Sequence, residues 1–255
     1  MVLNATLQQL HLPLEWVREP TLSEYLSGPN AEAVALVSAM AAGVGEPFLF
    51  LFGNTGTGKT HLLQAACIAA TEQGRQTHFV PLGAAGLEPI LFEDLERLDL
   101  VAIDDVQTIA GDAVWEHALF DLFNRMREKG RHLLAAAKSA PDALPLGLPD
   151  LRSRLQWGPR YCLTPLTDAD CEQLLIESAH RRGMDLNDQQ VRYIMNYHAR
   201  DPASLLTLVA QIDSLSLCEQ RQPTIPLIRR AMRGDVKTEP TLSPPGSSAA
   251  DARDE

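Results

Sequence analysis

FLFLFGNTGTGKT, residues 48–60, is the most informative stretch of this chain. Its five apolar residues, 48–52, are typical of a strand that is buried on both faces of a parallel sheet. The next eight match Gly-x-x-x-x-Gly-Lys-Thr, a loop that curls around phosphates with its backbone N–H groups pointing inward. We therefore predict a phosphate-binding loop (P-loop, or Walker A motif) made of Gly53, Asn54, Thr55, Gly56, Thr57, Gly58, Lys59 and Thr60.

The last two side chains of this loop have separate predicted roles. Lys59 supplies a positive charge for the β- and γ-phosphates of a nucleotide, and the Thr60 hydroxyl binds Mg²⁺. Good helix formers follow over residues 59–73, and Gly74 stands where a helix C-cap is expected. A glycine-rich turn with an incidental lysine is the alternative. The strand before the loop and the helix after it favour the nucleotide site.

A second chemical signal is LDLVAIDD, residues 98–105, an apolar strand that ends in two acids. Carboxylates that follow a parallel strand lie at the sheet edge where nucleotides bind. We predict that Asp104 holds Mg²⁺, directly or through water, and that Asp105 orients an attacking water. Paired acids also occur in loops simply because they are solvated, but the presence of Lys59 favours the chemical role.

Strands and helices alternate after the P-loop, which predicts an α/β fold with a parallel sheet. The further elements are strands at 77–82 and 132–137 and helices at 31–40, 87–98 and 113–129. On the last helix, His117 and Asp121 are interpreted as a surface pair. Its predicted core residues recur on one face: Val114, Trp115, Leu119, Leu122, Phe123 and Met126.

Residues 168–233 contain four helical segments and no strand-like alternation, which predicts a small all-α lid. Arginines make this module locally basic; solvated helix faces are the favoured explanation, and nucleic-acid binding is the alternative. The tail is rich in Pro, Ser, Ala, Gly and acids and is expected to be disordered. The predicted parts are an N-terminal segment (1–19), a nucleotide-binding domain (20–166), the lid (167–233) and the tail (234–255).

Composition limits the partners of the protein. With 33 acidic and 22 basic residues, the net charge is −11, so the surface as a whole repels nucleic acid and anionic membranes. Any DNA contact must be local or indirect. The four cysteines show no metal-ligand or disulfide spacing and are expected to be reduced, with Cys67 in the core. With no signal segment and no apolar run of about 18 residues, the expected location is the cytoplasm.

Two segments suggest contacts with other proteins. QLHLPL, residues 9–14, is either a flap that packs on its own domain or a peptide that docks extended into a partner's apolar pocket. DLRSRLQWG, residues 150–158, places two arginines on a predicted short helix. They are either solvated or paired within the domain, or Arg154 reaches the γ-phosphate of a neighbouring subunit.

Residues 53–60, 100–105 and 152–158, followed by the helical lid, resemble the AAA+ module of the bacterial replication initiator DnaA. The Gly-Pro-Asn at 28–30 and His61, which would join the nucleotide site, also occur in that family. The resemblance covers about residues 20–232 and implies an AAA+ P-loop NTPase fold with ADP or ATP and Mg²⁺ as cofactors. The origin-binding helix-turn-helix domain of DnaA is not expected in the tail.

A shorter branch of this family, the Hda regulators that inactivate DnaA, offers closer local likeness. Residues 9–14 resemble its sliding-clamp-binding motif, with Gln9, Leu10, Leu12 and Leu14 in the clamp pocket. This resemblance implies that the protein binds the DNA-loaded clamp (the β subunit of DNA polymerase III), meets ATP-bound DnaA and presents Arg154 as an arginine finger. Arg152 is the weaker candidate. DNA would be contacted mainly through the clamp, and a homo-oligomer is possible.

Two departures from the DnaA pattern concern the nucleotide sensors. The first sensor, a polar strand end with an aspartate in DnaA, reads Ala-Ala-Ala-Lys at 135–138, and the lid arginine falls at Ala203, with Arg200 three residues earlier. We therefore expect a regulator with ADP as its resident nucleotide and weak or absent ATPase activity. The alternatives are a helicase-loader type AAA+ ATPase that binds single-stranded DNA, and a clamp-independent paralogue that forms mixed filaments with DnaA.

Overall fold

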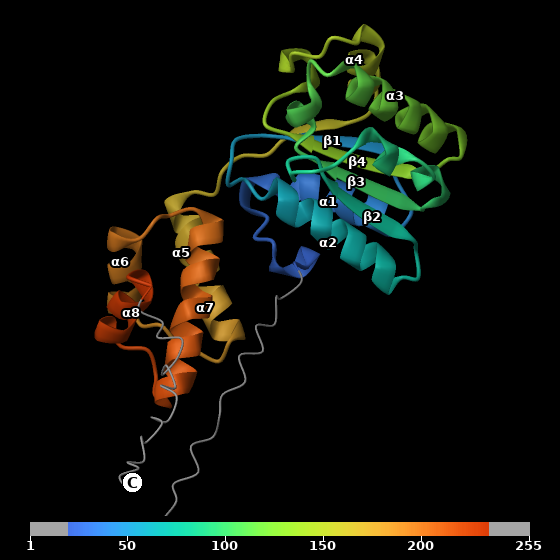
Figure 1. Cartoon of the computed structure of the whole chain (residues 1–255). Coiled ribbons are helices and arrows are strands. Elements are labelled where there is room, and N and C mark those ends of the chain that lie inside the picture. The colour runs from blue at the N-terminus through green and yellow to red at the C-terminus, as the bar shows by residue number, and fades with distance from the viewer. Residues whose placement is uncertain (1–19, 235–255) are drawn as a thin grey trace, which may run out of the picture. The chain divides into compact units, whose positions relative to one another are not determined.

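The computed structural model of this protein describes residues 20–234 (Figure 1). The clamp-binding peptide predicted at residues 9–14 lies outside the described residues, as does the predicted tail apart from Gly234. The described chain forms two compact units that divide after Asp170. We describe each unit by itself.

The first unit is built on a five-stranded sheet in the order β2-β3-β4-β1-β5, and every neighbouring pair of strands is parallel. The predicted parallel α/β fold is therefore confirmed. The FLFLF strand lies inside the sheet between β4 and β5, as its burial on both faces requires. The strands are β1 (Phe48–Phe52), β2 (Thr77–Pro81), β3 (Leu100–Asp104), β4 (His132–Ala137) and β5 (Arg160–Cys162).

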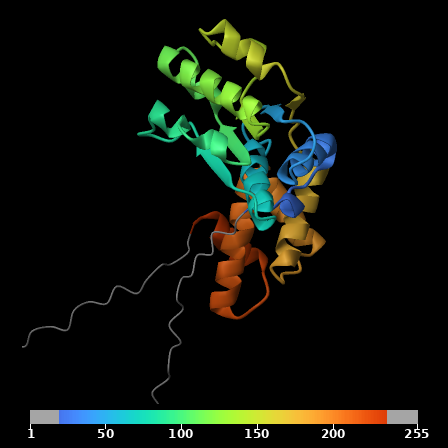
Figure 2. The same cartoon turned by 90° about the vertical axis from the view of Figure 1, so that its right-hand side faces the viewer.

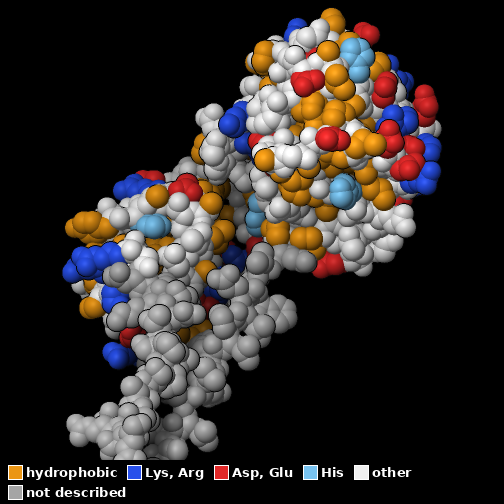
Figure 3. Space-filling model, viewed as in Figure 1, with side chains coloured by type: hydrophobic (Ala, Val, Ile, Leu, Met, Phe, Trp, Pro, Cys, Tyr) orange, Lys and Arg blue, Asp and Glu red, His pale blue; other side chains and the backbone are white. Residues whose placement is uncertain are grey.

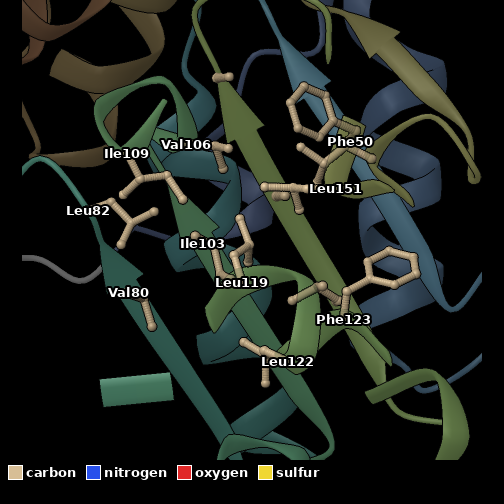
Figure 4. Close-up of a cluster of buried hydrophobic side chains, with 14 of the residues drawn as sticks. Phe50, Val80, Leu82, Ile103, Val106, Ile109, Leu119, Leu122, Phe123 and Leu151 are labelled. Carbon is tan, nitrogen blue, oxygen red and sulfur yellow. The ribbon is translucent and has the colours of Figure 1, made fainter. Parts of the chain in front are cut away.

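Successive side chains of each strand point to opposite faces of the sheet, and each face is covered by its own helices (Figure 2). One face packs Phe50 and Ile103 against α3 (Ala113–Glu128) and α4 (Pro149–Leu155), which contribute Leu119 and Leu151 (Figure 4). The other face packs Leu49 and Leu51 against α1 (Ala31–Ala41) and α2 (Lys59–Glu72). The P-loop helix α2 and the arginine-bearing helix α4 are thus on opposite faces.

The end of α2 explains why Gly74 is needed there. Gly74 has a φ of +76°, its N–H donates to the Thr71 carbonyl (2.9 Å), and the next N–H, of Arg75, donates to the Ala70 carbonyl (3.0 Å). This pair of bonds is the Schellman arrangement, which requires a left-handed residue and therefore favours glycine. The predicted helix and its C-cap are both confirmed.

The α-helix predicted over residues 87–98 is wrong. The structure has two 3₁₀ helices there, η3 (Pro89–Phe92) and η4 (Leu95–Arg97), separated by Asp94 at a φ of +63°. The terminal guanidinium nitrogen of Arg125 donates to the Phe92 carbonyl (2.9 Å), so a side chain of α3 takes the bond that a continuing helix would supply. A long-range contact therefore overrides the local helix propensity.

The predicted core face of α3 is confirmed except at its first turn. Leu119, Leu122, Phe123 and Met126 are buried, and Trp115 packs edge-on against Phe92 with ring centroids 5.7 Å apart. Val114 was expected in the core but is 68 % exposed. It lies at the edge of the apolar stripe, where the helix begins, so the sheet does not cover it. His117 and Asp121 are both exposed, as predicted.

Up to Gly234, where the description ends, the second unit contains four helices, as the sequence predicts for residues 168–233. Three of the helices have side-chain caps at their N-termini, from Asn187, Asp201 and Thr224. Across residues 20–234, no helix is both long and apolar enough to span a bilayer. The helices are α5 (Asp168–Arg181), which begins at the end of the first unit, α6 (Asp188–Tyr197), α7 (Pro202–Glu219) and α8 (Ile225–Met232).

Glu116 on α3 is a buried carboxylate that holds the chain leading into α4. It is 1 % exposed and accepts the backbone N–H groups of Gly111 (2.7 Å), Gly147 (3.0 Å) and Leu148 (2.6 Å). Burial acts to raise its pKa, but the three N–H bonds outweigh burial, so the pKa of Glu116 lies below its usual range. Leu148 is the N-cap of α4, so this carboxylate fixes where that helix begins.

We predict that Glu116→Gln lowers the free energy of unfolding at neutral pH by about 2–3 kcal/mol, because one acceptor oxygen is replaced by a donor facing an N–H. The folded-state pKa of Glu116 is depressed, so its contribution is present above the unfolded pKa and is lost as pH falls through the folded one. The difference between wild type and variant should therefore shrink as pH falls below about 4.5. Urea unfolding of both proteins at pH 7 and at acidic pH measures this difference in the free energy of unfolding. Glu128→Gln, on the exposed end of the same helix, is the matched control, and an equal loss in both variants would contradict the assignment.

Candidate nucleotide-binding site

The P-loop leaves the carboxyl end of β1 and turns directly into α2. The N–H of Gly53 donates to the Ala137 carbonyl (3.3 Å), which ties the start of the loop to β4. Gly56 and Gly58 have φ values of +84° and +85°, a region that favours glycine. At Gly58 a Cβ would also lie 2.5 Å from the ring of Tyr25. The loop therefore needs its glycines both for conformation and for space.

Lys59 is a buried cation inside this loop. Its side chain is 8 % exposed, and Nζ donates to the carbonyls of Gly53 (2.8 Å) and Asn54 (2.9 Å). Burial lowers the pKa of Lys59, and the negative charges of Asp104 and Asp105 partly oppose this shift. An ammonium group has three N–H donors, so one remains for a ligand. The positive charge, the remaining donor and the helix N-terminus together fit a phosphate group.

Thr60 and Asp104 lie side by side at the expected metal position. The Thr60 hydroxyl donates to Oδ2 of Asp104 (2.5 Å), and Oδ1 of Asp104 accepts the Asp105 N–H (2.9 Å). Asp104 is 2 % exposed, and this burial raises its pKa although both bonds favour ionisation. A hydroxyl and a carboxylate are hard oxygen ligands of the kind that Mg²⁺ takes together with nucleotide phosphates. The residues present therefore fit the ion.

Asp105 is tied to the end of β4 through a glutamine. Its backbone is left-handed, with a φ of +56°, and its Oδ1 accepts Nε2 of Gln107 (2.7 Å). Oε1 of Gln107 accepts the backbone N–H of Lys138 (3.0 Å). Gln107 was not predicted as a site residue. The sequence marks it only as a polar residue shortly after the paired acids. This bridge occupies one oxygen of the carboxylate that was predicted to orient water.

Lys138 is the residue that the sequence analysis expects in place of the aspartate of the first sensor. It follows Ala137, which pairs with Phe52 of β1, so it stands beside the start of the P-loop. The positive charge of Lys138 also lowers the pKa of Lys59. This effect is smaller than that of burial and acts in the opposite direction to the two aspartates. Lys138 is therefore a second positive charge close enough to act on Lys59.

The segment before α1 covers the P-loop, which the sequence analysis did not anticipate. The Tyr25 hydroxyl donates to the Thr57 carbonyl (2.9 Å), and burial raises the pKa of Tyr25 to about 12. Nδ2 of Asn30 donates to the Tyr25 hydroxyl (3.3 Å) and to the Thr164 carbonyl (2.9 Å). A ring nitrogen of His61 lies 3.0 Å from the Thr21 carbonyl. The Gly-Pro-Asn at 28–30 was the available signal, because it shapes the turn that carries Asn30.

The two candidate finger arginines differ in how they are held. Nε of Arg154 donates to Oδ1 of Asn124 on α3 (3.1 Å), and its guanidinium carbon lies 5.9 Å from the centre of the Phe120 ring. Arg152 donates to the Leu146 carbonyl (2.7 Å), and its Nε is buried with no hydrogen-bond partner among the described residues. Arg154 is thus oriented by α3 on the sheet face opposite to α2, whereas Arg152 holds the loop before its own helix.

The lid positions named from the sequence all belong to the second unit. Ala203 lies in the first turn of α7, immediately after the Asp201 cap and Pro202. Nε of Arg200 donates to the Met195 carbonyl at the end of α6 (2.9 Å). The predicted clamp-binding residues Gln9, Leu10, Leu12 and Leu14 lie outside the described residues.

Comparison with known proteins gives two family matches that together span most of the described chain. A family model of the bacterial DnaA ATPase domain matches residues 18–86 and 90–161, and a model of the Hda lid domain matches residues 168–232. The first match covers more than half of the 255 residues.

Solved structures share the fold at low sequence identity. Domain III of DnaA from Thermotoga maritima is 18 % identical, with a TM-score of 0.71, over 87 % of this chain and 98 % of that one. AMPPCP-bound DnaA from Aquifex aeolicus is 21 % identical, with a TM-score of 0.67, over 86 % and 70 %. The Thermotoga maritima RuvB Holliday junction branch migration motor is 17 % identical, with a TM-score of 0.62, over 85 % and 72 %.

We predict that Asp104→Asn makes the ligand-free protein more stable, by about 1 kcal/mol or about 2–4 °C in melting temperature, because a buried carboxylate with a raised pKa is replaced by a neutral amide. The same change should abolish the additional stabilisation that Mg²⁺ gives with ADP, because the amide is a poorer Mg²⁺ ligand. Thermal unfolding with and without Mg²⁺ and ADP measures both effects. Asp121→Asn, exposed on α3, should change neither. A variant that is destabilised without ligand, or that keeps the Mg²⁺ effect, would refute the assignment.

Proposed function

The chain is an AAA+ protein of the bacterial DnaA ATPase family with a lid of the Hda type, and on that basis we propose that it regulates replication initiation by stimulating ATP hydrolysis in DnaA. In this proposal it acts as a negative regulator, like the Hda regulators that inactivate DnaA. The protein binds the DNA-loaded sliding clamp and presents Arg154 to the ATP of DnaA.

The position of Arg154 is the observation that supports this proposal. Its contacts with Asn124 and Phe120 hold it on α3 and α4, while its own P-loop opens into α2 on the other face of the sheet. An arginine in this position is suited to a phosphate bound by a neighbouring molecule. A guanidinium group brought to a γ-phosphate stabilises the charge of the transition state, which is worth about 10³–10⁵ in rate where it has been measured.

In the proposal, the protein's own nucleotide acts mainly as a structural ligand. Lys59, Thr60 and Asp104 would hold ADP or ATP with Mg²⁺, which supplies positive charge to the phosphates. Asp105 has one carboxylate oxygen engaged by Gln107, and Lys138 stands where DnaA has a sensing aspartate. Both features favour nucleotide retention over rapid hydrolysis, because the water-orienting group is partly occupied. A ligand that binds only the folded state would stabilise the protein.

The clamp contact is assigned to residues 9–14, on the resemblance of this peptide to the Hda motif. A clamp encircles DNA, so attachment to it raises the local concentration of the regulator near DNA-bound DnaA. A weak peptide contact would then be sufficient. The proposed location is the cytoplasm, where these partners are found.

We predict that Arg154→Ala reduces stimulated ATP hydrolysis at least 100-fold, to the level without the protein, because the transition-state charge loses its cation (about 3 kcal/mol). The purified chain is mixed with ATP-bound DnaA, clamp and DNA, and conversion of ATP to ADP is followed. Arg154→Lys should rescue poorly, because an ammonium group lacks the planar fork of a guanidinium.

Two further variants sharpen this test. Arg97→Ala removes an exposed arginine of the first unit that is paired with Asp94 (2.8 Å), and this variant should stimulate normally. Asn124→Ala keeps Arg154 but removes the bond that orients it, so an intermediate loss is expected. If Arg154→Ala stimulates as well as wild type, the finger assignment is wrong. ATP turnover without DnaA, lost in Lys59→Ala, would instead support the helicase-loader type.

Removal of residues 1–14 should abolish retention on clamp-loaded DNA and leave the fold of residues 20–234 intact. Stimulation should then fall at low protein concentration and recover at high concentration, because only the tether is lost. Pull-down with immobilised clamp and a melting curve measure retention and folding. The double variant Leu12→Ala/Leu14→Ala tests the same contact with a smaller change than the truncation. Unchanged retention of the truncated chain would eliminate the peptide assignment.

A further inference from the structure

The outer surface of α6 and α8 in the second unit differs from the rest of this acidic protein. Figure 3 shows Lys or Arg side chains next to hydrophobic ones over these two helices. Asp188 is the one acidic residue in the sequences of the two helices, whereas they carry three arginines, and a fourth follows at the end of α8. These arginines are Arg192, Arg229, Arg230 and Arg233.

A pair of stacked tyrosines forms the centre of this surface. Tyr193 and Tyr197 are one turn apart on α6, with ring centroids 4.9 Å apart and planes tilted by 39°. Tyr197 is 72 % exposed, more than any other large apolar side chain of residues 20–234. Aromatic rings of this kind are usually buried at least on one side. Tyr197 rests on Tyr193 and leaves most of its surface open to solvent.

Arg229 connects this tyrosine pair to α8. Its Nε donates to the Tyr193 hydroxyl (3.1 Å), and its guanidinium carbon lies 5.9 Å from the centre of the Tyr193 ring. The bond uses one of the five N–H donors of the group, so within residues 20–234 the two terminal nitrogens are left for a ligand. Arg230 differs, because it is paired with Glu219 of α7. The exposed cation beside the rings is therefore Arg229.

We propose that the tyrosine platform, defined as Tyr193, Tyr197 and Arg229, binds single-stranded nucleic acid. A base would stack on the open face of Tyr197, and Arg229 would bind the adjoining phosphate. Stacking on exposed aromatic rings next to arginines is how proteins bind single strands without sequence preference. A duplex is excluded from this contact because its bases are already stacked on one another.

The charge of the whole protein limits the size of this site. At a net charge of −11, a long nucleic-acid footprint would be repelled. The platform offers one stacking surface and one cation, Arg229, which fits a contact of a few nucleotides. This proposal goes beyond the arginine-finger function and does not rest on it, because the platform belongs to the second unit alone. It gives the protein a direct contact with DNA in addition to the one through the clamp.

The test uses the full chain and a fluorescein-labelled 15-residue oligothymidine, with binding followed by fluorescence anisotropy at about 50 mM salt. Tyr197→Ala should weaken binding about 5- to 100-fold, the range measured for loss of one stacked base. Tyr197→Phe should bind within about twofold of wild type, because stacking needs the ring and not the hydroxyl. Arg229→Ala should weaken binding. The slope of log affinity against log salt concentration should also fall by about one, the amount expected for one lost phosphate contact.

Two matched controls come from the same unit. Leu217→Ala removes a side chain of α7 that is 61 % exposed, and Arg221→Ala removes an arginine paired with Glu219. Both should bind like wild type, and melting curves check that every variant is folded. The proposal is overturned if wild type does not bind the oligothymidine, if Tyr197→Ala binds as well as wild type, or if a duplex of the same length binds equally tightly.

Discussion

Parallel pairing of β1 with β4 is the constraint on which the nucleotide site depends. It sets Phe52 beside Ala137 and allows the Gly53 N–H to bond to the Ala137 carbonyl. Pairing of β4 with β3 then brings Asp104 to the same edge. Because these strands end at the same edge, Lys59 and Thr60 at the start of α2 lie beside Asp104 at the end of β3, although Asp104 is 44 residues beyond Thr60. A slip of one residue in the register of β3 would turn Asp104 to the other face of the sheet.

Unfavourable features are concentrated at this edge. Lys59 and Asp104 are buried ionisable groups, and Asp105 has a left-handed backbone. A non-glycine residue in such a conformation costs about 1–3 kcal/mol, and burial disfavours both charges. The two apolar layers on either side of the sheet offset these terms. A phosphate and a divalent ion that bind only the folded protein would stabilise it.

The contacts on the opposite face of the sheet position α4 and Arg154. Glu116 bonds to three backbone N–H groups and so fixes the start of α4, and Asn124 and Phe120 orient Arg154 from α3. None of these residues contacts the P-loop. The P-loop helix and Arg154 thus lie on two separate faces of the sheet, each held by its own set of contacts. Rigid support on α3 matters because a misplaced guanidinium loses most of its effect.

The sequence by itself determined the P-loop, the acid-ended strand, the Gly74 cap and the helical lid, because each depends on local backbone preferences or on a strict spacing. Only the tertiary structure decided the contacts of Tyr25, Asn30, Gln107 and Glu116, since their partners lie on other elements and no periodicity marks them. The same reason explains the wrong helix at 87–98, where Arg125 captures a carbonyl that local propensity would have assigned to the helix. It also explains the tyrosine platform: the sequence showed scattered arginines, and the packing of α8 against α6 placed one of them on a tyrosine.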